Sequence, residues 1–95
     1  MKYLEAYGFN SGEIKDFSKR NSEFLVDKLE NFDDLVSANL DYLKELGIEN
    51  FKEIFTKHAE IFLMDNKAFE DIFQKYDRED LIDKLKKNPD LVEQL

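Results

Sequence analysis

Residues 20–25 read RNSEFL, and two later stretches repeat the pattern, KHAEIF at residues 57–62 and KNPDLV at residues 87–92. Each copy begins with a cation and continues with a residue suited to ending a helix. A small residue or proline, an acid and two apolar residues follow. Because the copies recur at intervals typical of helical repeats, they indicate a stacked array of helix pairs.

The unit around each copy is predicted to be a helix, a short turn, a second helix and a brief turn or 3₁₀ segment. Apolar residues at helical spacing support this interpretation, as in Phe69, Ile72, Phe73 and Tyr76 at i, i+3, i+4 and i+7. Aromatic residues at this spacing are interpreted as core. The whole chain is one domain, residues 1–95, with units at residues 1–30, 33–65 and 66–95, and residues 27–34 joining the first unit to the second.

Helix starts are indicated by an Asx residue three places before an acid. The side chain of Asn or Asp can accept a hydrogen bond from a free backbone N–H, and the acid favours the positive end of the helix. Each such pair is expected to open the second helix of a unit. The pairs are Asn10 with Glu13, Asn50 with Glu53, and Asp77 with Asp80.

Helix ends are indicated by glycine and by the repeated phrase. Gly47 is expected to stop the first helix of the second unit. The leading cations of the phrase suit a last helical turn, where a positive charge meets the negative helix end. The next residues are expected to adopt a left-handed backbone, and the final apolar pair to turn back into the core. The residues expected to be left-handed are Asn21, His58 and Asn88.

Composition limits the classes of function. The chain has 22 acidic and 14 basic residues, a net charge of −8, no cysteine, three glycines and one proline. An evenly acidic chain repels phosphate backbones and anionic lipids, so basic partners are favoured. Without cysteine there is neither a disulfide nor a thiolate metal site. No apolar run reaches the length of a membrane span, the first residues lack a signal peptide, and we expect a cytoplasmic protein.

The repeats resemble those of the mitochondrial transcription termination factor (mTERF) family. That repeat has a helix ending in Leu-x-x-Leu-Gly, matched by residues 43–47, a second helix, and an ending similar to residues 87–91, KNPDL. The resemblance covers most of the chain and implies an all-α fold, a short superhelical solenoid of about three helix-turn-helix repeats. It also implies nucleic-acid binding through a basic concave surface, for which the phosphate contacts would be Arg20, Lys57 and Lys87.

A second resemblance is to the sterile alpha motif (SAM) domain, whose members associate with one another or with partner proteins. It is carried by the apolar pattern of residues 43–55 and by Glu79-Asp80-Leu81. This resemblance leaves the first 40 residues unexplained and lacks the long closing helix, so the repeat interpretation is preferred.

No residue pattern indicates catalysis. His58 is the only histidine, and its counterparts in the repeat are asparagines, which favours a role in ending a helix. The acids at Asp33-Asp34 and between Asp77 and Asp83 lack the spacing of a calcium loop and suit helix starts and solvated helix faces. Glycines are too sparse for a phosphate-binding loop. We therefore expect no catalytic, cofactor or metal site.

The sequence thus predicts a non-catalytic helical-repeat module that binds another protein. Apolar residues left uncovered at the terminal repeats would form an adhesive patch, which favours a protein partner or a homodimer. The alternative is an mTERF-like nucleic-acid-binding protein. In that case Arg20, Lys57 and Lys87 should point to one face of the molecule.

Overall fold

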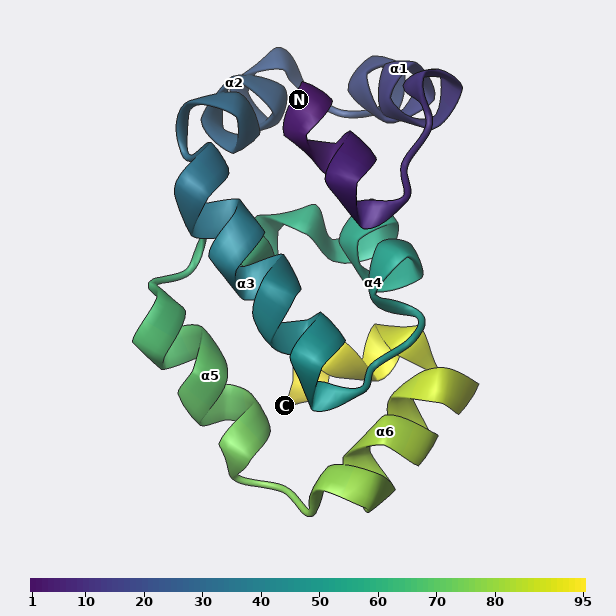
Figure 1. The fold of residues 1–95 in the computed structure, drawn as a ribbon, viewed down its shortest axis with the longest axis vertical. Helices are drawn as coiled ribbons and strands as arrows, with labels where there is room; N and C mark the ends of the chain where they lie inside the picture. Colours follow the sequence, from purple (N-terminus) through teal and green to yellow (C-terminus); the bar gives the residue numbers. More distant parts are fainter.

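The computed structural model describes all 95 residues, and it consists of helices without any β-strand (Figure 1). The predicted all-α class is confirmed. A 3₁₀ segment follows the second helix at two of the three repeated phrases, whereas an α-helix follows at the first. The elements are η1 (Lys2–Tyr7), α1 (Ser11–Arg20), α2 (Glu23–Asn31), α3 (Asp33–Leu46), α4 (Phe51–His58), η2 (Ala59–Leu63), α5 (Asn66–Gln74), α6 (Arg78–Lys87) and η3 (Pro89–Gln94).

The longest helix, α3, runs through the middle of the molecule from one end towards the other (Figure 1). The segments η1, α1 and α2 occupy one end, and α5 and α6 the other. The chain fills a volume of about 35 × 25 × 22 Å. None of the helices combines the length and the apolar character needed to cross a lipid bilayer.

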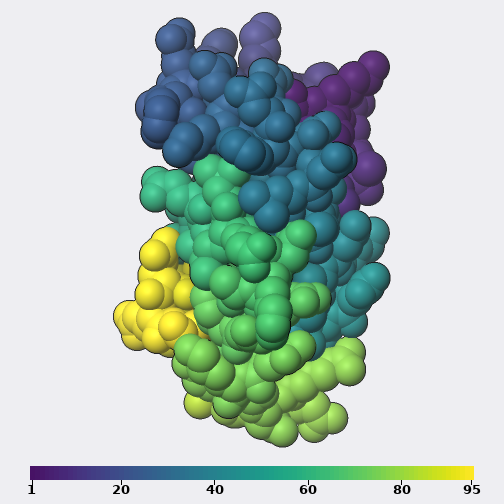
Figure 2. Space-filling view, turned by 90° about the vertical axis from the view of Figure 1, so that its left-hand side faces the viewer, coloured from purple at the N-terminus to yellow at the C-terminus, as the bar shows by residue number.

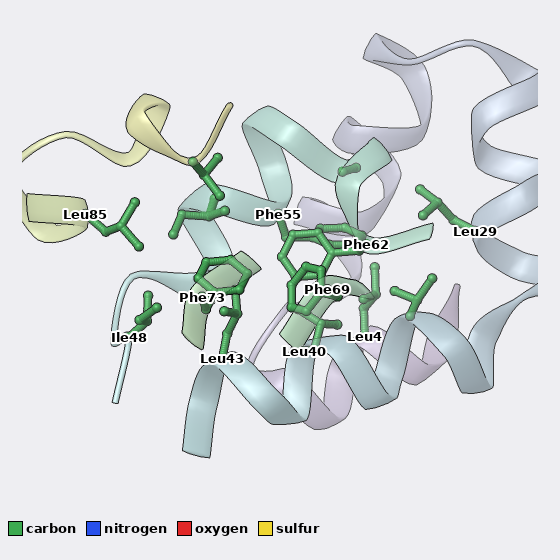
Figure 3. Close-up of a cluster of buried hydrophobic side chains, with 14 of the residues drawn as sticks. Leu4, Leu29, Leu40, Leu43, Ile48, Phe55, Phe62, Phe69, Phe73 and Leu85 are labelled. Carbon is green, nitrogen blue, oxygen red and sulfur yellow. The ribbon is translucent and has the colours of Figure 1, made fainter. Parts of the chain in front are cut away.

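A row of aromatic rings runs through the hydrophobic core, among buried aliphatic side chains such as Leu40 and Leu43 (Figure 3). Phe55 of α4 lies 5.4 Å from Phe17 of α1 and 5.3 Å from Phe62 of η2, measured between ring centroids. Phe62 in turn lies 5.4 Å from Phe69, which lies 5.0 Å from Phe73. These separations suit favourable ring packing, and all five side chains are buried. In the stripe of residues 69–76, Phe69 and Phe73 are therefore core, as predicted, whereas Tyr76 is exposed.

One buried polar side chain fixes η2 against α3. Asn39 donates hydrogen bonds to the carbonyl oxygens of Phe62 (3.0 Å) and Met64 (2.9 Å), and its own oxygen accepts one from Asn66 (2.8 Å). Each buried side-chain nitrogen or oxygen has a partner. A buried amide that is satisfied in this way sets the register between segments, because unmade hydrogen bonds would be costly there.

Two tyrosines attach the first segment to α2 and α3. The hydroxyl of Tyr3 donates to the carbonyl of Leu29 (2.7 Å), and that of Tyr7 contacts Asp41 (2.8 Å) and the carbonyl of Ser37 (3.0 Å). Burial raises the pKa of both hydroxyls above the ordinary tyrosine value. Both groups stay protonated at neutral pH and keep these bonds.

Two of the three predicted helix caps are confirmed. The backbone N–H of Glu13 donates to the side chain of Asn10 (2.8 Å), and the Glu13 carboxylate accepts from the Asn10 backbone (3.0 Å). Asp77 accepts from the backbone N–H of Asp80 (3.1 Å). Asn50 also immediately precedes a helix, α4, as predicted, but its side chain does not cap that helix and its amide donates instead to the carbonyl of Leu85 in α6 (3.0 Å).

The predicted helix stops are only partly correct. Gly47 ends α3 with a φ of +99°, and the N–H of Ile48 donates back to the carbonyl of Leu43 (3.1 Å). The left-handed backbone expected at Asn21, His58 and Asn88 is absent, since glycines alone have positive φ. At Asn21 the side chain ends the helix instead, by donating to the carbonyl of Phe17 (2.9 Å).

Candidate functional site

The first repeated phrase departs from the other two in where its apolar residues point. Phe62 and Val92, the last residues of the later copies, are buried, and Ile61 and Leu91 before them are partly buried against the core. In the first copy the corresponding pair was also expected to enter the core. That expectation is wrong for Phe24, which is 70% exposed.

The local structure explains this exposure. The hydroxyl of Ser22 accepts from the backbone N–H of Leu25 (3.2 Å), so the chain starts α2 at once instead of forming a 3₁₀ turn. Phe24, Lys28 and Phe32 then follow at i, i+4 and i+8 on one side of the chain. Phe32 is 52% exposed, and Nζ of Lys28 lies 4.5 Å from the centroid of the Phe24 ring.

A groove lies between this side of α2 and the 3₁₀ segment η2. Its larger hollow has a volume of about 540 Å³ and lies at the first turn of α2. A second hollow of about 210 Å³ shares Lys28 and Leu63 with the first. Figure 2 faces this side of the molecule, with α2 in blue above the green chain that contains η2. We call it the α2–η2 groove, defined by Arg20, Phe24, Leu25, Lys28, Phe32, Leu35, Glu60 and Leu63.

The groove carries more basic than acidic side chains, the opposite of the chain as a whole. The chain as a whole is strongly acidic, yet Arg20 and Lys28 line the groove with Glu60 as its one acid. A third hollow of about 310 Å³ shares Arg20 with the groove and adds Lys57. The cations of the groove itself are therefore Arg20 and Lys28, and Lys57 lies in the adjoining hollow.

The structure brings together two of the three cations that the resemblance implied as phosphate contacts. Arg20 and Lys57 line the same hollow, between α1 and α4, and Lys87 is not among its residues. Each of the three also has an acid one helical turn earlier. The ion pairs are Arg20 with Asp16 (2.5 Å), Lys57 with Glu53 (3.2 Å) and Lys87 with Asp83 (3.0 Å).

His58 makes contacts that its position in the sequence did not indicate. Its Nε2 lies 2.8 Å from the Asp90 carboxylate, and its Nδ1 lies 2.7 Å from the Glu93 carboxylate. The histidine thus connects the end of α4 to η3. The hydrogen bond from His58 holds the pKa of Asp90 below its ordinary value. Both partners are more than 30 residues away, so no local spacing could have revealed them.

The acidic residues named in the sequence do not gather into a metal site. No group of three or more His, Cys, Asp or Glu side chains is arranged to hold an ion. Asp77 caps α6 as expected, and Asp80 and Asp83 form ion pairs with Lys84 and Lys87 along that helix. At the start of α3, Asp33 accepts from the backbone N–H of Asp34 (2.9 Å).

Comparison with family models, curated proteins and solved structures finds no match to this chain.

Proposed function

We propose that this chain is a non-catalytic interaction module that binds a segment of a partner protein in the α2–η2 groove. The observation that carries the proposal is Phe24, a large aromatic side chain held outside the core by the capped start of α2. Phe32 is exposed on the same side of the chain and extends the apolar surface. Contiguous exposed aromatic residues mark interaction sites far more often than scattered ones.

Burial of this exposed aromatic surface would contribute part of the binding free energy. Complete burial of a phenylalanine side chain contributes on the order of 1.5–3 kcal/mol. Phe24 has most of its surface exposed to water and Phe32 about half. Both residues line hollows that can accept side chains from a partner. Aromatic anchors that enter pockets dominate many interfaces, so these two residues are the expected hot spots.

We also propose that the fold is built from repeats like those of the mTERF family. Burial recurs at equivalent places in α3–α4–η2 and α5–α6–η3, which supports this relationship. Leu43 and Phe73 are buried in the first helix of each unit, Phe55 and Leu85 in the second, and Phe62 and Val92 in the 3₁₀ segment. The first unit differs because α2 replaces the 3₁₀ segment, and this replacement creates the groove.

The proposal is tested by site-specific photocrosslinking in the cells that make the protein. A photoreactive phenylalanine analogue is placed at position 24, at position 32, or at position 76 as the control. Tyr76 is also an exposed aromatic residue, but it lies outside the groove. We expect one and the same protein to be captured at 24 and 32 and not at 76. The purified partner should then bind Phe24→Ala at least tenfold more weakly than it binds the unchanged protein.

Equal capture at all three positions, or none at 24 and 32, contradicts the proposal. Capture of a second copy of the chain would make the groove a homodimer interface instead. Light scattering of the purified protein at several concentrations would confirm that outcome.

A second candidate function is nucleic-acid binding, favoured by the placement of Arg20 and Lys57 in one hollow. Their ion pairs with Asp16 and Glu53 are surface pairs one turn apart, which are weak and can be exchanged for phosphate. Fluorescence anisotropy with labelled duplex DNA, single-stranded DNA and RNA at low salt tests it. Binding that falls steeply with added salt, and that is lost in Arg20→Ala/Lys57→Ala, would support this function. Absence of binding at high micromolar protein would remove it.

A further inference from the structure

We infer that the α2–η2 groove binds an amphipathic α-helix whose acidic residues face Arg20 and Lys28. The inference rests on the proposed function and specifies the chemistry of the partner. Its apolar side chains would enter the hollows beside Phe24, Phe32 and Leu63.

The architecture of the groove favours a helix over other peptide conformations. A strand binds by pairing with the free edge of a sheet, and this protein has no strand. Both walls of the groove are helical segments, so they present side chains rather than free backbone groups. From Phe24 to Phe32 the wall is about 12 Å long at roughly 1.5 Å per helical residue, the length of about two helical turns. A partner helix with apolar residues at i, i+3, i+4 and i+7 matches that length.

The charges at the rim indicate that the helix is acidic. Nζ of Lys28 lies over the Phe24 ring, so a carboxylate that pairs with it also covers the aromatic anchor. Arg20 is paired only with Asp16, one turn away on the same exposed helix face. Such a pair is weak and can be shared with an incoming carboxylate. Glu60, on the opposite wall, would repel an acid there. The partner's acids should therefore line the edge of its helix that faces α1 and α2.

The inference is tested with the full chain and three labelled peptides of equal length and equal apolar content. The first is an amphipathic helix with glutamates beside its apolar stripe, the second has lysines at those positions, and the third is the first with a central proline. Affinity is measured by fluorescence anisotropy, and the binding site by backbone amide shifts in NMR spectra. We expect the acidic helix to bind at least tenfold more tightly than the other two, with shifts confined to α2, η2 and the end of α1.

Charge reversal provides the matched control. Arg20→Glu/Lys28→Glu should invert the preference, so that the lysine peptide binds more tightly than the glutamate peptide. Lys44→Glu/Lys86→Glu makes the same change in charge on two exposed residues, also in last helical turns, that lie outside the groove. This control variant should keep the original preference. Circular dichroism establishes that both variants are folded.

Several outcomes would overturn the inference. They are equal binding of the glutamate and lysine peptides, no peptide binding at all, or a preference that survives Arg20→Glu/Lys28→Glu. Labelled single-stranded DNA, duplex DNA and RNA are included in the same assay, and tighter binding of any of them through Arg20 and Lys28 would also overturn it. If crosslinking at position 24 still captures a protein through a segment that is not an acidic helix, the proposed function stands and this inference alone fails.

Discussion

The imidazole of His58 lies 2.8 Å from the carboxylate of Asp90 and ties the end of α4 to the last segment of the chain. The other ring nitrogen contacts Glu93 at 2.7 Å. Only 15% of the His58 side chain remains exposed, and both of its ring nitrogens are occupied by these contacts.

The first prediction concerns the pKa of Asp90. In the folded protein the pKa of this carboxyl is lowered, chiefly by the hydrogen bond from His58. A lowered pKa stabilises the folded state above the unfolded value of about 3.9 and loses that contribution as pH falls through the folded value. In His58→Asn we expect the Asp90 pKa to rise towards the ordinary aspartate range. Carbon NMR of the carboxyl groups between pH 2 and 6 measures the change.

Asp27, exposed on α2, is the control carboxyl and should titrate alike in both proteins. The other charged groups near the contact are Glu93 on η3 and Lys57, itself paired with Glu53, on α4. An unchanged Asp90 titration in His58→Asn would show that these groups, rather than the histidine, determine its pKa.

The second prediction concerns the aromatic core. Phe55 is fully buried and packs against Phe9, Phe17 and Phe62. Phe55→Ala should lower the free energy of unfolding by about 3–5 kcal/mol, because it removes apolar contacts and leaves a cavity. Urea denaturation followed by circular dichroism measures the loss. Phe24→Ala, the same substitution at an exposed position, should change stability by no more than about 0.5 kcal/mol. Similar losses in the two variants would place Phe24 in the core.

The third prediction concerns the buried amide of Asn39. Asn39→Ala removes two donors from the carbonyl oxygens of Phe62 and Met64 and one acceptor from Asn66. Leaving such groups without partners is expected to reduce the free energy of unfolding by about 1–3 kcal/mol. Thermal denaturation checks this value, with the exposed Asn31→Ala as the control. A stability equal to that of the control would mean that η2 does not depend on this contact.

The fourth prediction concerns the end of α3. Gly47 has a φ of +99°, and a Cβ added there would lie 3.3 Å from Cδ1 of Ile82. Gly47→Ala should therefore destabilise the protein by about 1–2 kcal/mol, from the left-handed backbone alone or with some crowding of α6. Gly12→Ala is the comparison, because a Cβ at Gly12 in α1 would likewise lie 3.3 Å from a neighbour, Oδ1 of Asn10, but the backbone there is not left-handed and alanine favours a helix. Denaturation midpoints in urea should fall clearly for the first substitution and little or not at all for the second.

Much of the secondary structure could be predicted because it depends on neighbours within a few residues. The caps at Asn10 and Asp77 and the stop at Gly47 each involve groups no more than five positions apart. Phe69 and Phe73 were predictable as core because a helix places them on one face. The position of the candidate groove could not be predicted from the sequence. The repeat pattern predicts an uncovered apolar patch at a terminal repeat, but it does not predict that Phe24 forms this patch.

The amino-acid sequence by itself determined the helical class, the boundaries of α1, α4 and α6 and the end of α3, because these follow from backbone hydrogen bonding and spacing along the chain. Only the tertiary structure decided the use of side chains that meet distant segments. The side chain of Asn50 donates to the carbonyl of Leu85 and does not cap α4. The side chain of His58 contacts Asp90 in η3. Phe24 stayed outside while Phe62, in the next copy, entered the core. The physical reason is that burial and pairing depend on which segment packs alongside, and that segment lies tens of residues away.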